Sequence, residues 1–233
     1  MSVATVDPNS VADSVALIRQ RIADLAGGRT VHLIAVTKGF GADAISAASA
    51  AGCTMIGENF AQELVSKIAE MTNSPKTSAI FLPEVHFIGQ LQTNKVRKLA
   101  GVVEVWQSVD RASLVDELVS RVPGARVFVQ VNATRETDKG GCSPEQVAGL
   151  VERCRASELR VQGLMAVGPT SPDAERTSTA FALTRRLADD NGLADCSMGM
   201  TDDMEIAIEQ GATHVRIGRA VFGGRPHQRA RIR

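Results

Sequence analysis

The sequence predicts a single (β/α)8 barrel with an extra helix at its N-terminus, and three observations support this fold class. Eight short apolar segments, rich in β-branched residues, alternate with helical patterns along the 233 residues. That length suits one closed barrel. No Pro/Ser-rich linker or shift of composition divides the chain. An open doubly wound sheet is the alternative, but neither its G-x-G-x-x-G fingerprint nor a Walker G-x-x-x-x-G-K-[ST] motif is present.

The first helix is predicted from Ser10, where apolar residues begin to recur at spacings of three and four. These residues are Val11, Val15, Ile18, Ile22 and Leu25. Gly27 and Gly28 end the helix, because glycine readily adopts the left-handed backbone of a helix end. We expect one domain over residues 1–233 with flexible tails at residues 1–9 and 226–233, the Arg-rich end from Arg225 being solvated.

The strands are predicted where apolar and β-branched residues form short runs. They cover residues 31–38, 54–57, 85–89, 102–109, 128–132, 161–167, 195–199 and 213–218. Helices are predicted between them, at residues 42–51, 58–71, 93–100, 175–190 and 202–210, and after Asp110 and Ser143. Ser143 is a strong helix start, because Pro144 suits the first helical position and Gln146 completes a capping box.

Composition and charge exclude several classes of function. The chain has 26 basic and 26 acidic side chains, so it lacks the basic excess of proteins that hold nucleic acid or anionic membranes. It has no Tyr, which excludes any mechanism that needs a phenol from this chain as the general acid or base. Only six of the basic residues are lysines, so lysine chemistry has few candidates.

The N-terminus and the cysteines indicate a cytosolic protein. The first ten residues show no basic region followed by an apolar one, and no apolar run reaches the length of a membrane span. Cys53, Cys142, Cys154 and Cys196 form no C-x-x-C pair and lack the spacing of a zinc site. We interpret them as small buried or half-buried thiols.

The active face of a barrel is the one that bears the carboxyl ends of the strands. The loops after strands seven and eight, SMGM and IGRAVFGG, are rich in glycine, which lets backbone amides approach a phosphate. Ser197, the amides near Gly199, and those of Gly218 and Arg219 are therefore candidate ligands of a monoester phosphate. The alternative is that these glycines only make tight turns.

Lys38 ends the first strand on the same face. Partial desolvation there favours its neutral amine, the form that attacks an aldehyde to give an imine; the alternative is a lysine that snorkels at the rim. Lys67, Lys95 and Lys98 lie on patterned helices and Lys76 in a loop, so we expect all four to be solvated. Lys139 follows strand five, also on the active face.

A lysine and a phosphate site on one rim suggest a phosphorylated aldehyde, and pyridoxal 5′-phosphate (PLP) is the economical choice. Arg216, at the end of strand eight, can direct its guanidinium at the pyridine nitrogen. Because Arg stays protonated, it would keep that nitrogen unprotonated and weaken the ring as an electron sink. Such a site holds the cofactor well and stabilises carbanions poorly.

Six ordered motifs resemble the PLP homeostasis proteins, single-domain relatives of the N-terminal barrel of alanine racemase. They are IAVTKG with Lys38, GENFAQEL at 57–64, HFIGQLQTNKVR at 86–97, QVNATRETDKGG at 130–141, GLMAVGP at 163–169 and SMGMTDDMEIAIEQGATHVRIGRAVFG at 197–223. The resemblance implies a fold-type III PLP barrel and a cofactor-binding regulator of vitamin B6 and amino-acid pools without established turnover. It further implies a Lys38 imine, Asn59 beside the cofactor, Ser197, Gly218 and Arg219 at the phosphate, and Arg216 at the ring nitrogen.

Two positions depart from that family. Phe60 stands where members often have Tyr, which suggests packing instead of hydroxyl chemistry. Arg219 stands where many have Thr, which leaves its backbone amide as the phosphate contact.

Two functions remain to be distinguished: a PLP carrier, and an amino-acid racemase. Racemisation needs acid/base groups on both faces of the substrate, and the related racemase uses a lysine and a tyrosine. This chain has no Tyr, and nothing beside Cys142 or Cys196 prepares a thiolate. We therefore expect a carrier in the cytoplasm, a monomer, with PLP as ligand and apo PLP-dependent enzymes as candidate recipients. We expect no metal, no nucleic acid and no membrane partner.

Overall fold

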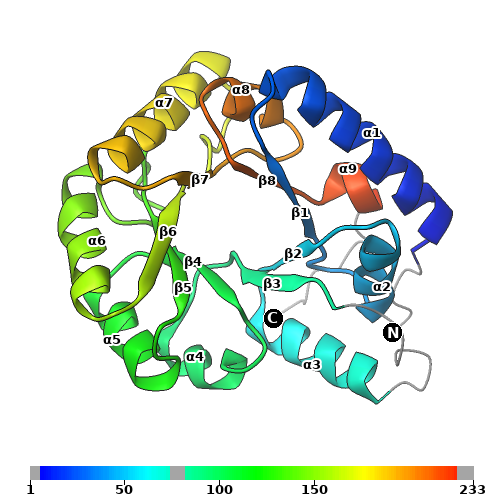
Figure 1. The fold of residues 1–233 in the computed structure, drawn as a ribbon, viewed down its shortest axis with the longest axis horizontal. Helices are drawn as coiled ribbons and strands as arrows, with labels where there is room; N and C mark the ends of the chain where they lie inside the picture. The colour runs from blue at the N-terminus through cyan, green and yellow to red at the C-terminus, as the bar shows by residue number, and fades with distance from the viewer. Residues whose placement is uncertain (1–5, 74–81, 225–233) are drawn as a thin grey trace, which may run out of the picture.

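The computed structural model describes residues 6–73 and 82–224, and over these residues the predicted closed barrel is confirmed (Figure 1). Eight parallel strands follow one another in chain order, and the last pairs with the first: Ile34 of β1 lies opposite Arg216 of β8. The strands are β1 (His32–Val36), β2 (Met55–Glu58), β3 (Glu84–Phe87), β4 (Val105–Val109), β5 (Arg126–Gln130), β6 (Arg160–Met165), β7 (Asp195–Ser197) and β8 (His214–Ile217).

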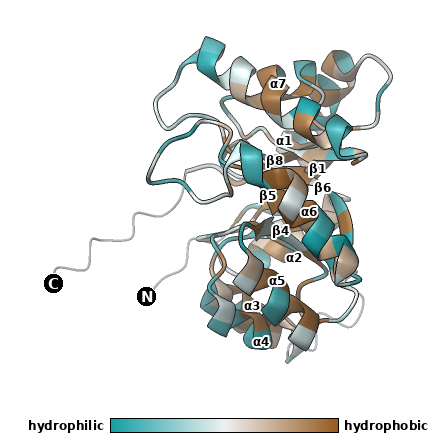
Figure 2. Ribbon diagram, turned by 90° about the vertical axis from the view of Figure 1, so that its left-hand side faces the viewer, coloured by the Kyte–Doolittle hydropathy of each residue, from teal (hydrophilic) through white to brown (hydrophobic). Residues whose placement is uncertain are grey.

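Helices surround the strands on the outside of the barrel. They are α1 (Pro8–Ala26), α2 (Ala42–Ala50), α3 (Ala61–Thr72), α4 (Thr93–Leu99), α5 (Ala112–Arg121), the 3-10 turn η2 (Pro144–Gln146), α6 (Val147–Ala156), α7 (Ala174–Asp190), α8 (Met204–Glu209) and α9 (Arg219–Phe222). The extra helix α1 packs against α2, α8 and α9 beside the closure of the sheet (Figure 1). Hydrophilic and hydrophobic stretches alternate along α5, α6 and α7, as amphipathic helices require (Figure 2).

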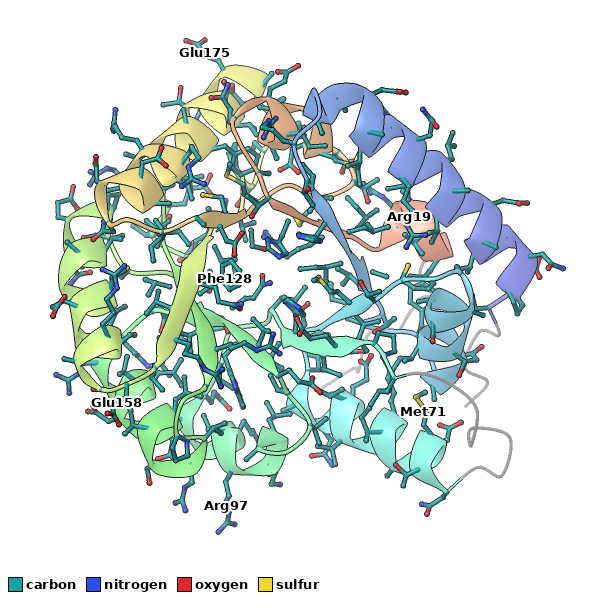
Figure 3. The ribbon with its side chains drawn as sticks, viewed as in Figure 1. Arg19, Met71, Arg97, Phe128, Glu158 and Glu175 are labelled. Carbon is teal, nitrogen blue, oxygen red and sulfur yellow. The ribbon has the colours of Figure 1, made fainter. Side chains whose placement is uncertain are left out.

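The main core fills the layer between the strands and the helices. Its largest members are fully buried, such as Trp106, Leu64 and Phe181. Phe128 points into the interior of the barrel (Figure 3). It forms a separate small cluster with Val105 and Met165. Because successive strand residues face opposite sides, the same strands supply both apolar layers and the polar groups described below.

The N-terminal boundary differs from the prediction. The helix begins at Pro8 instead of Ser10, because Asp7 caps it by accepting from the amide of Asn9 and Pro8 suits the first turn. The amide of Val6 donates to Asp43, so part of the predicted tail at residues 1–9 is ordered against α2. The predicted tail at 226–233 lies outside the described residues.

Several inner boundaries also move. Glu58 belongs to β2, so α3 begins at Ala61 and not at residue 58. The strand predicted from residue 102 begins at Val105, and the short α9 was not predicted. The capping box of Ser143 and Gln146 is confirmed, although its first turn is 3-10.

All four cysteines are buried, which confirms their interpretation as buried thiols. Across the two described ranges, no helix is both long and apolar enough to cross a bilayer.

Candidate functional site

A cavity of about 290 Å³ opens at the carboxyl ends of β1 and β8 and under the loop after β7. Four of the predicted site residues line it together: Lys38, Arg216, Gly218 and Arg219. This volume is close to the lower end, roughly 300 Å³, of the usual range for small-molecule sites. The structure therefore brings the predicted amine, guanidinium and glycine loop to one place.

Lys38 is the second residue of a tight turn that follows β1. The amide of Phe40 donates to the carbonyl of Thr37 at 3.2 Å, and Gly39 has φ of +82°, in the left-handed region that glycine favours. The Lys38 side chain is half-buried on the cavity wall. A sharp turn thus aims the lysine at the mouth of the barrel.

Arg216 is 4% exposed, and its guanidinium is held from behind. It donates to the hydroxyl of Ser197 at 2.9 Å and to the carbonyl of Ala166 at 2.7 Å. Burial lowers the pKa of Arg216 to about 10, so the group remains a cation at neutral pH. A buried guanidinium on the wall can donate to a ring nitrogen without releasing a proton to it.

Ser197 does not line this cavity. It is fully buried behind Arg216, and its hydroxyl donates to Gln107 at 2.7 Å while it accepts from Arg216. The predicted role as a phosphate ligand is therefore replaced, in this geometry, by support of the guanidinium. The physical reason is the strand register, which turns the last residue of β7 into the barrel before the loop begins.

From Ser197 the hydrogen bonds continue down the barrel. Gln107 donates to His86 at 2.8 Å, and His86 donates to Glu84 at 2.7 Å. Glu84 also pairs with Arg126 at 2.7 Å. The hydrogen bond from His86 and the pairing with Arg126 lower the pKa of Glu84 to about 2. All hydrogen bonds in this series run in the same direction, from Arg216 at the rim to the carboxylate of Glu84 at the opposite end of the strands.

Thr201 lines the cavity where Ser197 was expected to do so. It sits in the turn between β7 and α8, whose preceding Gly199 has φ of +94° and leaves no space for a Cβ beside Ala207. In the described part of the chain, no carbonyl or carboxylate accepts from the amides of Thr201 and Asp202. The sequence signal was the Thr201 hydroxyl, two residues after Gly199 in SMGMT, beyond the predicted end of the strand.

Gly218 and Arg219 form the other wall. A Cβ on Gly218 would lie 3.1 Å from the carbonyl of Val36, so glycine lets β1 and the loop after β8 approach closely. The Arg219 side chain is exposed and pairs with Asp202. This ion pair offsets the negative charge of Asp202, which would otherwise repel an anionic ligand.

Asn59 lies on a neighbouring cavity and not on the wall that carries Lys38. This second cavity, of about 640 Å³, is also lined by Phe60, Gln90 and Lys95. The side-chain oxygen of Asn59 is buried without a partner among the described residues. Phe60 is 56% exposed and lines this cavity with an apolar ring that has no hydroxyl.

The solvated position expected for Lys67 is wrong. Its side chain is 4% exposed and pairs with Glu58 at 2.6 Å and Glu63 at 2.5 Å. The helical pattern did not reveal this, because the partner Glu58 was placed in the helix instead of the strand. Lys95 is half-buried, Lys98 is exposed, and Lys76 lies outside the described residues.

Three further residues were singled out by the sequence: Lys139, Cys142 and Cys196. Lys139 pairs with Glu136 at 2.7 Å and donates to the carbonyl of Gly168, which ties the loop after β5 to the one after β6. Burial raises the pKa of both Cys142 and Cys196 to about 12. Neither thiol is therefore available as an acid/base group near neutral pH.

These residues fit a phosphorylated aldehyde. The cavity offers one amine, one buried guanidinium, and a hydroxyl with two amides in the turn of Thr201 and Asp202. The hydroxyl and amides suit phosphate oxygens.

Comparisons with known proteins identify the family of this chain. A family model for the N-terminal domain of alanine racemase matches residues 6–226. A pyridoxal phosphate homeostasis protein of Pseudomonas aeruginosa is 40% identical, over 94% of this chain and 97% of its own. The solved structure of PipY from Synechococcus elongatus with PLP bound is 29% identical with a TM-score of 0.79, over 91% of this chain and all of that one.

A more distant likeness concerns the fold alone. Alanine racemase from Corynebacterium glutamicum is 17% identical with a TM-score of 0.69, and the match covers 98% of this chain but 65% of the racemase. Given the family model and the extent of the match to the Pseudomonas relative, this chain belongs to the pyridoxal phosphate homeostasis protein family, built on the N-terminal barrel of alanine racemase.

Proposed function

We propose that this protein binds PLP at the rim cavity and acts in the homeostasis of PLP and of amino acids, as a carrier without sustained catalytic turnover. One observation carries the proposal: the same cavity is lined by Lys38, Arg216, Thr201 and Gly218. The PLP bound to PipY and the name of the Pseudomonas relative support it.

Each residue has a separate role in holding the cofactor. PLP supplies an aldehyde that reacts with amines and a ring that withdraws electrons. Lys38 would hold PLP through its aldehyde carbon, and Arg216 would donate to the ring nitrogen. Thr201, together with the backbone near Gly218 and Arg219, would hold the phosphate. Ser197 supports Arg216, and Asn59 borders the site from the neighbouring cavity.

The racemase alternative lacks a second acid/base group. The chain has no Tyr, and the thiols of Cys142 and Cys196 are buried with a pKa of about 12. A cation at the ring nitrogen also limits the stabilisation of a carbanion. The same features suit a protein that keeps the aldehyde of PLP bound and unreactive until the cofactor is transferred to an enzyme.

Titration with PLP, followed by absorbance near the imine band, tests the binding. Lys38→Ala should remove that band and leave the unfolding transition in place, because a rim lysine contributes little to the core. Apo enzyme mixed with the loaded protein should gain activity if the protein is a carrier. A colourless protein that ignores PLP, or steady loss of optical rotation from one L-amino acid, would contradict the proposal.

We also propose that the carrier is a cytoplasmic monomer whose recipients are apo PLP-dependent enzymes. Size-exclusion chromatography with light scattering measures the mass, which should match one chain of 24.7 kDa. A stable dimer whose interface covers the rim would contradict free delivery of the cofactor.

A further inference from the structure

A buried ionic cluster lies directly behind the turn that carries Lys38. It consists of Glu58 at the end of β2 and Glu63 and Lys67 on α3. Glu58 is fully buried and Lys67 is 4% exposed, whereas Glu63 is 23% exposed. The cluster lies between the strands and α3, whereas the Lys38 cavity lies at the mouth of the barrel.

The cluster contacts the backbone on both sides of Lys38. The Lys67 ammonium donates to the carbonyl of Thr37 at 2.8 Å, and the Glu63 carboxylate accepts from the amide of Gly39 at 2.6 Å. The Thr37 hydroxyl donates to Glu58 at 2.6 Å. The residues before and after Lys38 are therefore both tied to one ionic group.

Stability alone does not account for such a cluster. Burying ions costs free energy, and replacing a buried ion pair with apolar residues of similar volume is often neutral or stabilising. A fixed arrangement of charges does specify geometry, because each ion must keep its partners. The part specified here is a turn of four residues with a single reactive side chain.

We infer that Glu58, Glu63 and Lys67 are positioning residues for Lys38, holding its turn so that the amine meets the aldehyde carbon of PLP. This inference rests on the proposed function, since it assigns a role toward the same cofactor. The cluster acts on the covalent contact of Lys38, whereas the phosphate and the ring are held by other loops. Its loss should therefore affect aldehyde binding selectively.

Two ligands separate these effects: PLP, and pyridoxine 5′-phosphate, which carries an alcohol in place of the aldehyde. In Glu63→Ala we expect the affinity for PLP and the imine fraction of bound PLP to fall about tenfold, while the affinity for pyridoxine 5′-phosphate changes less than about twofold. Glu63→Gln keeps an acceptor for the Gly39 amide and should restore much of the imine. Glu70→Ala, an exposed glutamate on the same helix, is the matched control.

Lys67→Met is the stronger variant, with Lys67→Arg as its rescue. Glu63→Ala carries the test if Lys67→Met does not fold, because Glu63 is partly exposed. Equal losses of affinity for PLP and pyridoxine 5′-phosphate, or an unchanged imine fraction in Glu63→Ala, would overturn the positioning role but not the proposed function. Wild-type protein that binds neither ligand would overturn the proposed function and this inference with it.

Discussion

Ser197 and Thr201 stand four residues apart in one motif, and the structure gives them different surroundings. Ser197 is fully buried between Gln107 and Arg216, whereas Thr201 lines the cavity. The sequence favoured the serine because it belongs to the glycine-rich segment SMGM, which suits a phosphate. It could not tell which hydroxyl faces the ligand, since that depends on where β7 stops and on the bend at Gly199.

Substitutions at these two hydroxyls should affect different properties: the affinity for PLP at Thr201, and the stability of the fold at Ser197. Thr201→Val should lower the affinity for PLP about 10- to 100-fold, because a hydrogen bond to a charged group contributes about 1.5–3 kcal/mol. The affinity for unphosphorylated pyridoxal should change little. Ser197→Ala should instead lower the free energy of unfolding by about 1–3 kcal/mol, because it leaves buried groups of Gln107 and Arg216 without a partner.

Calorimetric titration with PLP and with pyridoxal, beside urea denaturation, measures both effects. Loss of phosphate affinity in Ser197→Ala, with Thr201→Val unchanged, would return the phosphate role to Ser197.

At the scale of elements, the sequence predicted all eight strands and their order, because apolar runs and helical spacing alternate so regularly. Boundaries were less accurate wherever a polar residue ends a strand. Glu58 is the clearest case: a glutamate before an amphipathic helix looks like a helix residue, but it is buried beside Lys67 at the end of β2. Whether two buried charged residues form an ion pair depends on tertiary contacts, which the spacing of residues along the sequence does not reveal.

Close contact between neighbouring strands also depends on tertiary structure. A Cβ on Gly163 of β6 would lie 2.1 Å from the carbonyl of Asp195 on β7, so Gly163→Ala should separate these strands. We expect a loss of about 3 kcal/mol or more in the free energy of unfolding. Gly149 in α6 has nothing within 4 Å of an added Cβ, and Gly149→Ala should stabilise the protein by about 0.5–1 kcal/mol.

Chemical denaturation of the two variants measures this contrast. If Gly163→Ala were as stable as wild type, the close approach of β6 and β7 would not hold in solution.

At the scale of the whole molecule, the barrel interior joins the rim to the opposite end through polar groups. Arg216 connects by way of Ser197, Gln107 and His86 to Glu84. Beside this chain, the His214 ring lies against Phe128 and 4.9 Å from the ring of His32. The sequence placed Arg216 at the rim but did not predict this series of hydrogen bonds, because the residues that form it come from four strands.

His214 should make the whole molecule sensitive to mild acid. Burial, with smaller contributions from His32 and His86, lowers the pKa of His214 to about 3 from 6.5. Between these values the unfolded chain binds a proton that the folded chain does not, so stability falls as pH decreases below about 6.5. The dependence on His214 should approach about 1.4 kcal/mol per pH unit.

The window from about pH 6.5 to pH 5 excludes the effect of Glu84, because its lowered pKa affects stability only below its ordinary value of 4.5. Urea denaturation across that window should show a shallower slope in His214→Gln than in wild type. His32→Gln, at an exposed position, serves as the control and should keep most of the slope. An unchanged slope in His214→Gln would show that the ring is not buried in its neutral form.

We propose that Lys38 holds PLP at the rim of this barrel. Borohydride reduction of the PLP-loaded protein, followed by peptide mapping, tests this proposal, since reduction fixes the bond between the amine and the aldehyde carbon. We expect one pyridoxyl group per chain, on the peptide that contains Lys38. Label on Lys95 or Lys139 in its place, or protein that remains unlabelled, would contradict it.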